Sequence, residues 1–541
     1  MQLFVSVNGE QQGPFSVDQI KGYLAMGHFQ NTDLAWHEGL TDWKPLQEFP
    51  EFAQKAHRTP NYKGMAVRPA EQKRRKGGKG KSALVAVLAV VVVAAAGGGG
   101  YYYWKNYLQK GGTNNGALAV TNSPDLAASQ PGDPKTLEEL NGWYAEPAAG
   151  QNAATFFEQG FDALQITNTD RNSSSLPLIG KAAMPVINVP VPSGMKTALR
   201  AFLERNSSAL ELFERGAQCS GSRYPLDLAK GGETLLPHLP KVRTAAQLAE
   251  LNALQQSDLH QGANAGQSVW LTLAAARTLE PEPLLVSQLV RVACDSAAVD
   301  ALEQTVNRVA LPAESLTQLQ SAFNQAADYD AAGTGFNRAL KAERVTGTAT
   351  FDAGPEKLRE MLLRMPPGAG QGTMQATNLD KILSSLKEQR QFYEDSVNQL
   401  VVARKDALPA RLKADDVMTP RAEEAKSKGY LICTMLMPAL GKVTSREAGG
   451  LARLRLAQTA IALERFRAAN NHYPDSLNEL APKFLAAVPN DPFDGQPLRY
   501  RKSVEGYLLY SIGPDLKDDG GARKPGSDDL PFVVVRPPKG L

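Results

Sequence analysis

An uncharged apolar run at residues 82–104 constrains this chain of 541 residues more than any other feature. As an α-helix rising 1.5 Å per residue, the run would be about 34 Å long. That length is enough to cross a hydrocarbon layer about 30 Å thick. Lys81 and Lys105 close the two ends of the run. The sequence therefore predicts one transmembrane helix over residues 82–104.

The charges on either side of this run predict its orientation. Residues 73–81 hold six basic residues and no acidic one, whereas Lys105 and Lys110 follow the run more sparsely. The positive-inside rule then places the N-terminus in the cytoplasm. We expect a single-pass protein of the bacterial inner membrane with a large periplasmic C-terminal part. A buried core helix is disfavoured by the length of the run, and a cleaved signal peptide by the residues that precede it.

Composition excludes several classes of function. The formal net charge of +3 is too small to indicate nucleic-acid binding. The three cysteines, Cys219, Cys294 and Cys433, show no CxxC spacing and no disulfide framework. In a periplasmic domain one pair of them would be open to oxidation, and the sequence does not choose which. The six histidines show no HExxH pattern, so we expect no zinc site.

Residues 1–52 predict a small α+β domain. Alternating residues 3–7 are typical of a strand, and Asn8-Gly9 is a turn dipeptide. Ser16 is placed to cap a helix with apolar positions at Val17, Ile20, Tyr23 and Leu24.

The same residues carry a resemblance to a known family. Gly13-Pro14-Phe15, Ile20, Tyr23 and Gly27-His28-Phe29 resemble the signature of GYF domains, and residues 35–46 resemble the bacterial branch of that family. Members of the family bind proline-rich peptides on an aromatic surface. The resemblance implies a platform for a proline-rich or other peptide on the cytoplasmic side, made of Phe15, Tyr23, Phe29 and Trp36. The alternative is that these aromatic side chains form the core of a very small domain.

Flexible linkers are predicted at residues 53–81 and 105–135, which lack periodicity and are rich in glycine, proline and polar residues. Residues 136–437 predict a mostly α-helical region, either a TPR-like solenoid or a bundle, without a clean repeat period. The expected helices cover residues 137–145, 155–166, 195–219, 243–262, 264–280, 282–306 and 378–404. Residues 222–253 and 280–293 resemble uncharacterised bacterial envelope proteins, a resemblance that implies no activity.

Catalytic motifs are weak throughout the chain. Gly80-Lys81-Ser82 lacks the opening glycine of a phosphate-binding loop, and residues 368–373 lack the third glycine of a dinucleotide-binding loop. The hydroxyl groups of Ser220 and Ser222 lie outside any nucleophile-elbow spacing. We therefore expect a protein that is not an enzyme.

Residues 438–541 predict an α+β module. A helix is expected over residues 445–470, followed by a short helix capped by Asp475 or Ser476. Alternation then favours a hairpin that turns at residues 504–506, with an edge strand at residues 533–536.

This order resembles the globular part of type II secretion pseudopilins, on Tyr473-Pro474, residues 491–495, residues 498–500, Tyr510-Ser511 and residues 513–515. No pilin leader precedes the module, so we expect a shared fold without pilus assembly. Those pseudopilins bind calcium in an acidic loop. The resemblance implies a Ca²⁺ site, the only cofactor expected, and the candidate ligands are Asp515, Asp518, Asp519, Asp528 and Asp529. A solvated acidic loop is the alternative.

These predictions lead to one main hypothesis and two alternatives. The main hypothesis is a membrane-anchored, non-enzymatic adaptor or envelope-assembly protein. Its GYF-like module would bind a peptide, its outer helical region would bind envelope proteins, and one helix would contact the lipid bilayer. The alternatives are a component related to the type II secretion machinery and an extracytoplasmic enzyme with an unrecognised site.

Overall fold

The computed structural model describes residues 2–7, 10–17, 20, 33–37, 40, 43–49, 51, 132–354, 356–358, 382–523 and 527–536. The chain divides into two compact units. One contains the N-terminal domain, and the other contains the helices together with the C-terminal strands.

The N-terminal domain contains a four-stranded antiparallel sheet of order β2-β1-β3-β4. Its elements are β1 (Gln2–Val7), β2 (Glu10–Ser16), β3 (Leu34–Trp36), β4 (Lys44–Pro45) and the 3₁₀ helix η1 (Leu46–Glu48). Leu3, Val5, Ile20, Leu46 and Phe49 form its buried core. The predicted strand at residues 3–7 is confirmed, whereas most of the helix predicted after Ser16 lies outside the described residues.

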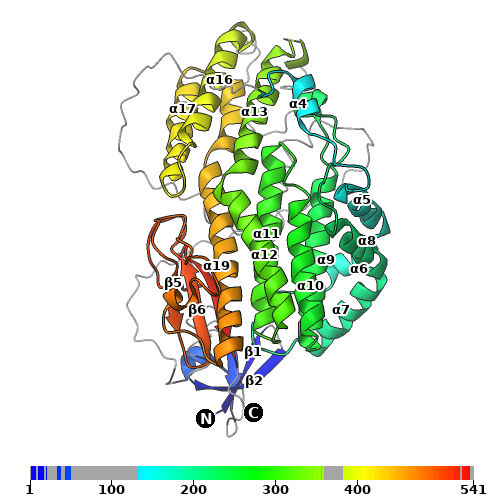
Figure 1. The fold of residues 1–541 in the computed structure, drawn as a ribbon, viewed down its shortest axis with the longest axis vertical. Helices are drawn as coiled ribbons and strands as arrows, with labels where there is room; N and C mark the ends of the chain where they lie inside the picture. Colours follow the sequence, from blue (N-terminus) through cyan, green and yellow to red (C-terminus); the bar gives the residue numbers. More distant parts are fainter. Residues whose placement is uncertain are drawn as a thin grey trace, which may run out of the picture. The chain divides into compact units, whose positions relative to one another are not determined.

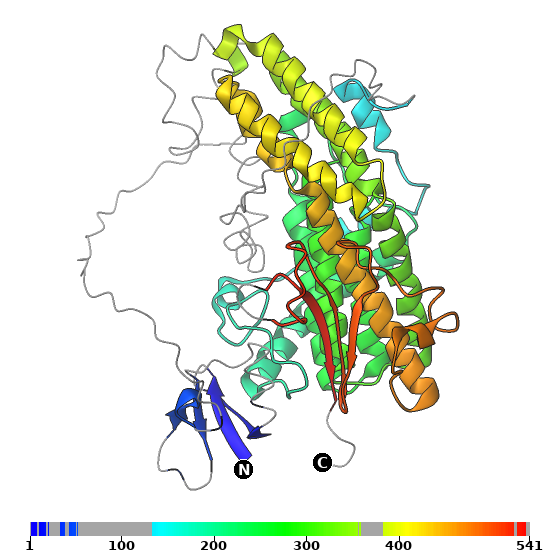
Figure 2. The same ribbon diagram turned by 90° about the vertical axis from the view of Figure 1, so that its left-hand side faces the viewer.

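The second unit is mostly helical, as Figures 1 and 2 show. Its first elements are α4 (Leu137–Trp143), α5 (Ala153–Ala163), α6 (Asn168–Asn172), α7 (Ser193–Arg205), α8 (Ser207–Ala217), η2 (Leu228–Glu233), α9 (His238–Asp258), α10 (Gly262–Arg277), α11 (Leu285–Val306), α12 (Ala313–Ala331) and α13 (Thr334–Asp352). The later ones are α16 (Leu386–Ala403), η4 (Ala410–Ala414), α17 (Asp415–Ser427), α18 (Leu431–Leu436), η5 (Met437–Leu440), α19 (Val443–Asn470) and η6 (Leu477–Leu480).

Helices α9, α10 and α11 pack against one another, α12 packs on α10, and α19 returns to pack on α11 and α12 (Figure 1). The apolar positions predicted in α19, including Leu451, Ile461 and Phe466, are all buried. One hydrophobic cluster joins them to residues of α9, α10, α11 and α12 and of the C-terminal sheet. The predicted helical region and the predicted C-terminal module therefore share a core.

The C-terminal sheet has the order β5-β6-β7, with β5 (Arg499–Lys502), β6 (Gly506–Ser511) and β7 (Leu530–Val535). Both the predicted hairpin and the predicted edge strand are confirmed. Gly506 begins β6, where a Cβ atom would lie 1.9 Å from the carbonyl oxygen of Val534, so only glycine fits. The short helix before the sheet is also confirmed, since Ser476 and Glu479 form a capping box.

Helix α11 also supplies hydrogen bonds to the backbone of β7. The Val533 N–H donates to Glu303 Oε1 at 2.6 Å, and the Asn307 amide donates to the Val533 carbonyl oxygen at 2.8 Å. The Val535 N–H donates back to Asn307 Oδ1 at 2.8 Å. Since β7 is an edge strand, these side chains satisfy backbone groups that would otherwise lack strand partners.

A buried ionic group ties α11 to α12. The guanidinium group of Arg291 donates to Asp295 at 2.9 Å and to Asp330 at 2.5 Å, and all three side chains are almost inaccessible. Burial raises the pKa of Asp330, while the charge of Arg291 opposes that shift. Removing one partner from such a group leaves an uncompensated buried charge, which is strongly destabilising.

One predicted helix proves to be two. The segment at residues 195–219 breaks at Asn206, where α7 ends and α8 begins. The fully buried Asn206 side chain donates to the Phe202 carbonyl oxygen at 2.8 Å and accepts from the Gln165 N–H at 2.8 Å. Asparagine competes for backbone hydrogen bonds in this way, and apolar periodicity alone does not reveal the break.

The prediction of a transmembrane helix over residues 82–104 is corrected. Among the described residues no helix is both long enough and apolar enough to cross a membrane. The longest, α19, has 28 residues and carries Arg446, Arg453 and Glu464 within it. Residues 82–104, on which the prediction was based, lie outside the described residues. The fold class is therefore corrected to a mostly helical protein with a small N-terminal sheet, and a single-pass inner-membrane localisation is not supported.

Candidate functional site

The N-terminal sheet separates two kinds of side chain. Leu3 and Val5 are fully buried, and Ala35, which pairs with Val5 in register, is buried too. Successive residues of a strand point to opposite faces, so Phe4 lies on the other face. The register places Phe4 directly opposite Trp36. One face of the sheet thus forms the core, and the other carries aromatic rings.

The rings on this second face lie close together. The centroids of Phe4 and Trp36 are 6.1 Å apart, and those of Trp36 and Trp43 are 6.5 Å apart. Both separations lie in the range of favourable aromatic pairs. The three side chains are only half-buried, and Leu34, two residues before Trp36, is 42% exposed. We call Phe4, Leu34, Trp36 and Trp43 the aromatic face.

A hydrogen bond holds the central ring of the aromatic face in place. The indole N–H of Trp36 donates to the carbonyl oxygen of Leu40 at 2.8 Å. The hydrogen bond therefore fixes the orientation of this half-buried ring. Such a side chain offers a large contact area at low cost in conformational entropy, because few of its torsions remain to be ordered.

The predicted platform is only partly visible. Trp36 lies on the aromatic face, and Phe15 lies in β2, paired in register with Leu3. Tyr23 and Phe29 lie outside the described residues. Phe4 and Trp43 were not among the predicted residues. The signals that would have found them are the strand alternation of residues 3–7 and the second tryptophan seven residues after Trp36.

Comparisons with known proteins agree with this geometry for the N-terminal segment. Residues 4–52 match the family model described as GYF domain 2. The chain thus begins with a GYF domain, which indicates peptide binding and a role in protein interaction. No curated protein and no solved structure matches the chain. The GYF prediction is confirmed, and the resemblances to pseudopilins and to envelope proteins receive no support.

Several of the predicted calcium ligands in the acidic loop between β6 and β7 accept hydrogen bonds from nearby backbone N–H groups. Asp515 accepts from the Lys517 N–H at 3.1 Å, and Asp518 accepts from the Gly520 N–H at 2.9 Å. Asp529 accepts from the Gly521 N–H at 2.7 Å through Oδ2, while its buried Oδ1 has no hydrogen-bond partner. Burial raises the pKa of Asp529, and the nearby charges of Asp518 and Asp519 raise it further.

The described residues contain no group of three or more histidine, cysteine, aspartate or glutamate side chains placed to hold a metal ion. The five aspartates, Asp528 included, therefore do not form a preassembled calcium site in that part of the chain. The three cysteines are free and buried. Burial raises the pKa of Cys294 and of Cys433 to about 12, so their reactive thiolate forms are scarce at neutral pH.

Proposed function

We propose that this protein is a non-enzymatic adaptor whose N-terminal GYF domain binds a proline-rich peptide. The single observation that carries the proposal is the aromatic face, where Phe4, Trp36 and Trp43 lie in ring contact outside the core. The helical unit acts as a scaffold that binds a second partner. The absence of an enzymatic activity stays a prediction.

The aromatic face suits a proline-rich ligand for two physical reasons. A polyproline II helix has no internal hydrogen bonds and is already ordered before binding, so little entropy is lost when it docks. Its pyrrolidine rings pack well against flat aromatic surfaces. Leu34 extends the apolar surface beside Trp36 and is exposed enough to contact a ligand.

An octaproline peptide titrated into the full-length protein tests the proposal. We expect saturable binding that changes the tryptophan fluorescence, and at least about a thirtyfold loss of affinity in Trp36→Ala, the size of an interface hot spot. Leu34→Ser provides a second, milder variant, because truncating an exposed side chain disturbs the fold little. It should lose affinity by about threefold.

The matched control is Gln47→Ala, which changes an exposed residue of η1 in the same domain. Its affinity should equal that of the unmodified protein. The proposal fails if octaproline does not bind at millimolar concentration, or if Leu34→Ser and Trp36→Ala bind it unchanged.

The predicted relation to type II secretion is not part of the proposal, since no match to a secretion protein supports it.

A further inference from the structure

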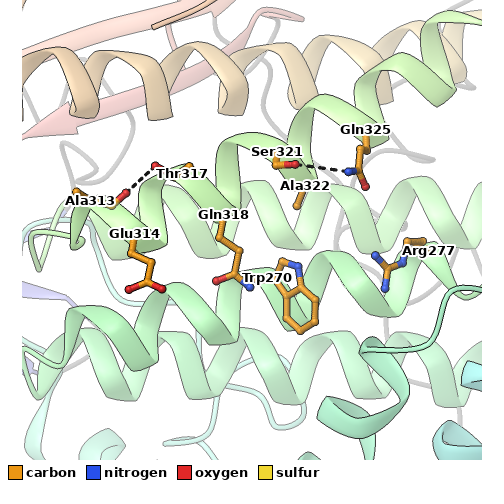
Figure 3. A pocket seen from close by; sticks show the side chains of 9 residues that line it. All are labelled: Trp270, Arg277, Ala313, Glu314, Thr317, Gln318, Ser321, Ala322 and Gln325. Carbon is orange, nitrogen blue, oxygen red and sulfur yellow. Dashed lines mark hydrogen bonds between the residues drawn. The ribbon is translucent and has the colours of Figure 1, made fainter.

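A groove of about 680 Å³ lies between α10 and α12 of the helical unit (Figure 3). Two residues of α10 and seven of α12 line it: Trp270, Arg277, Ala313, Glu314, Thr317, Gln318, Ser321, Ala322 and Gln325. Six of these nine side chains are polar or charged. A third helix with an apolar face would find little to pack against here.

The lining residues form two straight stripes. Glu314, Gln318, Ser321 and Gln325 follow one another at intervals of four, three and four residues, so they share one side of α12. The stripe is about 16 Å long at 1.5 Å per residue. The second stripe belongs to α10, where Trp270 and Arg277 lie about two turns apart. An extended peptide of about five residues spans the same length.

Several groups in the groove have unused hydrogen-bonding capacity. The side chains of Trp270, Glu314 and Gln318 make no hydrogen bond to any other residue in the described part of the chain. Ser321 and Gln325 meet only at 3.5 Å. An indole N–H and a primary amide together offer donors and an acceptor to the backbone of an extended chain. The half-buried ring of Trp270 adds an apolar surface between them.

The two charges of the groove lie at opposite ends (Figure 3). The exposed carboxylate of Glu314 marks the end near the start of α12. Arg277 marks the other end, where one of its nitrogens donates to the carbonyl oxygen of Ala217 and so fixes the guanidinium group. The residues between these two ends are uncharged. This arrangement complements a ligand that carries a positive charge at one end and a negative charge at the other.

We propose that this groove binds an extended segment of a partner protein, about five residues long, with its cationic side chain at Glu314 and its anionic side chain at Arg277. The backbone of the segment pairs with Gln318 and the Trp270 indole. This site gives the helical unit its own ligand, chemically distinct from the proline-rich ligand of the GYF domain.

Four capped peptides without proline test the proposal on the full-length protein: Lys-Thr-Val-Thr-Asp, Asp-Thr-Val-Thr-Lys, Lys-Thr-Val-Thr-Lys and Asp-Thr-Val-Thr-Asp. Binding is followed by calorimetry. We expect one of the two peptides with opposite end charges to bind about three- to tenfold more tightly than either like-charged peptide. The preferred order of charges then gives the direction in which the chain lies.

Charge reversal at one end sharpens this test. Glu314→Lys changes an exposed side chain, so the fold is preserved, and the doubly acidic peptide should become the tightest ligand. Glu204→Lys is the matched control, because Glu204 is an exposed glutamate of α7 outside the groove and the ranking should stay as in the unmodified protein. Trp270→Phe should weaken all four peptides, since the indole N–H is lost.

Three results would overturn the proposal. The first is that no peptide binds at millimolar concentration. The second is a ranking that Glu314→Lys leaves unchanged. The third is concentration-dependent self-association that Glu314→Lys abolishes, because a second copy of this chain would then be the occupant. Octaproline binding at the GYF domain is measured separately, so either proposal can fail without the other.

Discussion

The two sheets of this protein treat their outer faces differently. The N-terminal sheet buries Leu3 and Val5 on one face and leaves Phe4 and Trp36 half-exposed on the other. In the C-terminal sheet, five of the six residues of β6 are buried, and Tyr507 and Leu509 join the cluster formed with α19. Aromatic residues on the first sheet are therefore available to a ligand, whereas those on the second hold the structure together.

The β7 edge of the C-terminal sheet also has a structural role. Glu303 of α11 and Asn307, the residue after this helix, form hydrogen bonds with the backbone of β7 and so hold the strand against the helices. A strand fastened in this way is poorly suited to pair with a partner chain. At its β7 edge, the C-terminal sheet therefore completes a helical core.

The largest expected effect is that of truncating a buried aromatic residue in the C-terminal sheet. Tyr507 is 1% exposed, and its ring centroid lies 4.9 Å from that of Tyr473. Tyr507→Ala should lower the free energy of unfolding by about 3–5 kcal/mol, as for other large-to-small core substitutions. Trp36→Ala in the other sheet should cost clearly less, because its ring is only half-buried. Urea denaturation measures both, and equal losses would break the comparison.

The hydrogen bonds between Asn307 and β7 should contribute somewhat less to the free energy of unfolding than the Tyr507 ring does. Asn307→Leu keeps a side chain of similar size but leaves the Val533 carbonyl and the Val535 N–H without their partner. We expect a loss of about 2–4 kcal/mol, since each unsatisfied buried group costs about 1–3 kcal/mol. The control Asn264→Leu changes an exposed asparagine of α10 and should stay within about 0.5 kcal/mol. A neutral Asn307→Leu would mean that β7 needs no support from α11.

The stability of the helical unit should fall as the pH rises from 4.5 to about 7. Burial raises the pKa of Glu280 and of Glu343 from 4.5 to about 7. The folded protein therefore binds more protons than the unfolded chain between these values. The stabilisation is complete below pH 4.5 and is lost as the pH approaches and passes 7. Each carboxyl group should account for about 3 kcal/mol.

Glu343→Gln tests the sign of this dependence. The variant should show a flatter fall in the free energy of unfolding between pH 5 and pH 8, whereas Glu204→Gln, on an exposed site, should behave like the unmodified protein. Hydrogen exchange at peptide resolution then sharpens the comparison of the sheets. The protection of the β6 and β7 amides against exchange should fall as the free energy of unfolding falls, because these strands share a core with α9 to α12. A rise in stability with pH would contradict the assignment.

Much of the local structure was predictable where side chains act within a few residues, with the break at Asn206 as an exception. Apolar periodicity located α10, α11 and α19, and strand alternation located β1, β5 and β6. The cap at Ser476 was one of two candidates, and the Glu479 carboxylate three residues later decided between them. These features depend on neighbours in sequence, so the sequence contains the information directly.

Features that depend on distant partners were not predictable. Nothing near Asn307 in sequence indicates that its side chain meets Val533 and Val535, which lie more than two hundred residues away. The core shared by α19 and α12 likewise joins residues that are far apart in the sequence. The GYF signature gave the domain and Trp36, but the contact of Phe4 with Trp36 required the register of β1 and β3. The transmembrane prediction failed to find support because no described helix has the required length and apolarity together.

The smallest expected effect concerns calcium in the loop that joins β6 to β7. Asp529 keeps one buried oxygen without a partner, and the charges of Asp518 and Asp519 act on it. A calcium ion would have to draw these carboxylates together, because they are not preassembled, and that movement limits its affinity. At a tenfold excess over its dissociation constant, calcium would stabilise the full-length protein by about 1.4 kcal/mol. We therefore expect millimolar calcium to raise the melting temperature by a few degrees, magnesium to raise it less, and Asp529→Asn to abolish the difference. An unchanged melting temperature in calcium would remove the site and leave the loop as a solvated acidic turn.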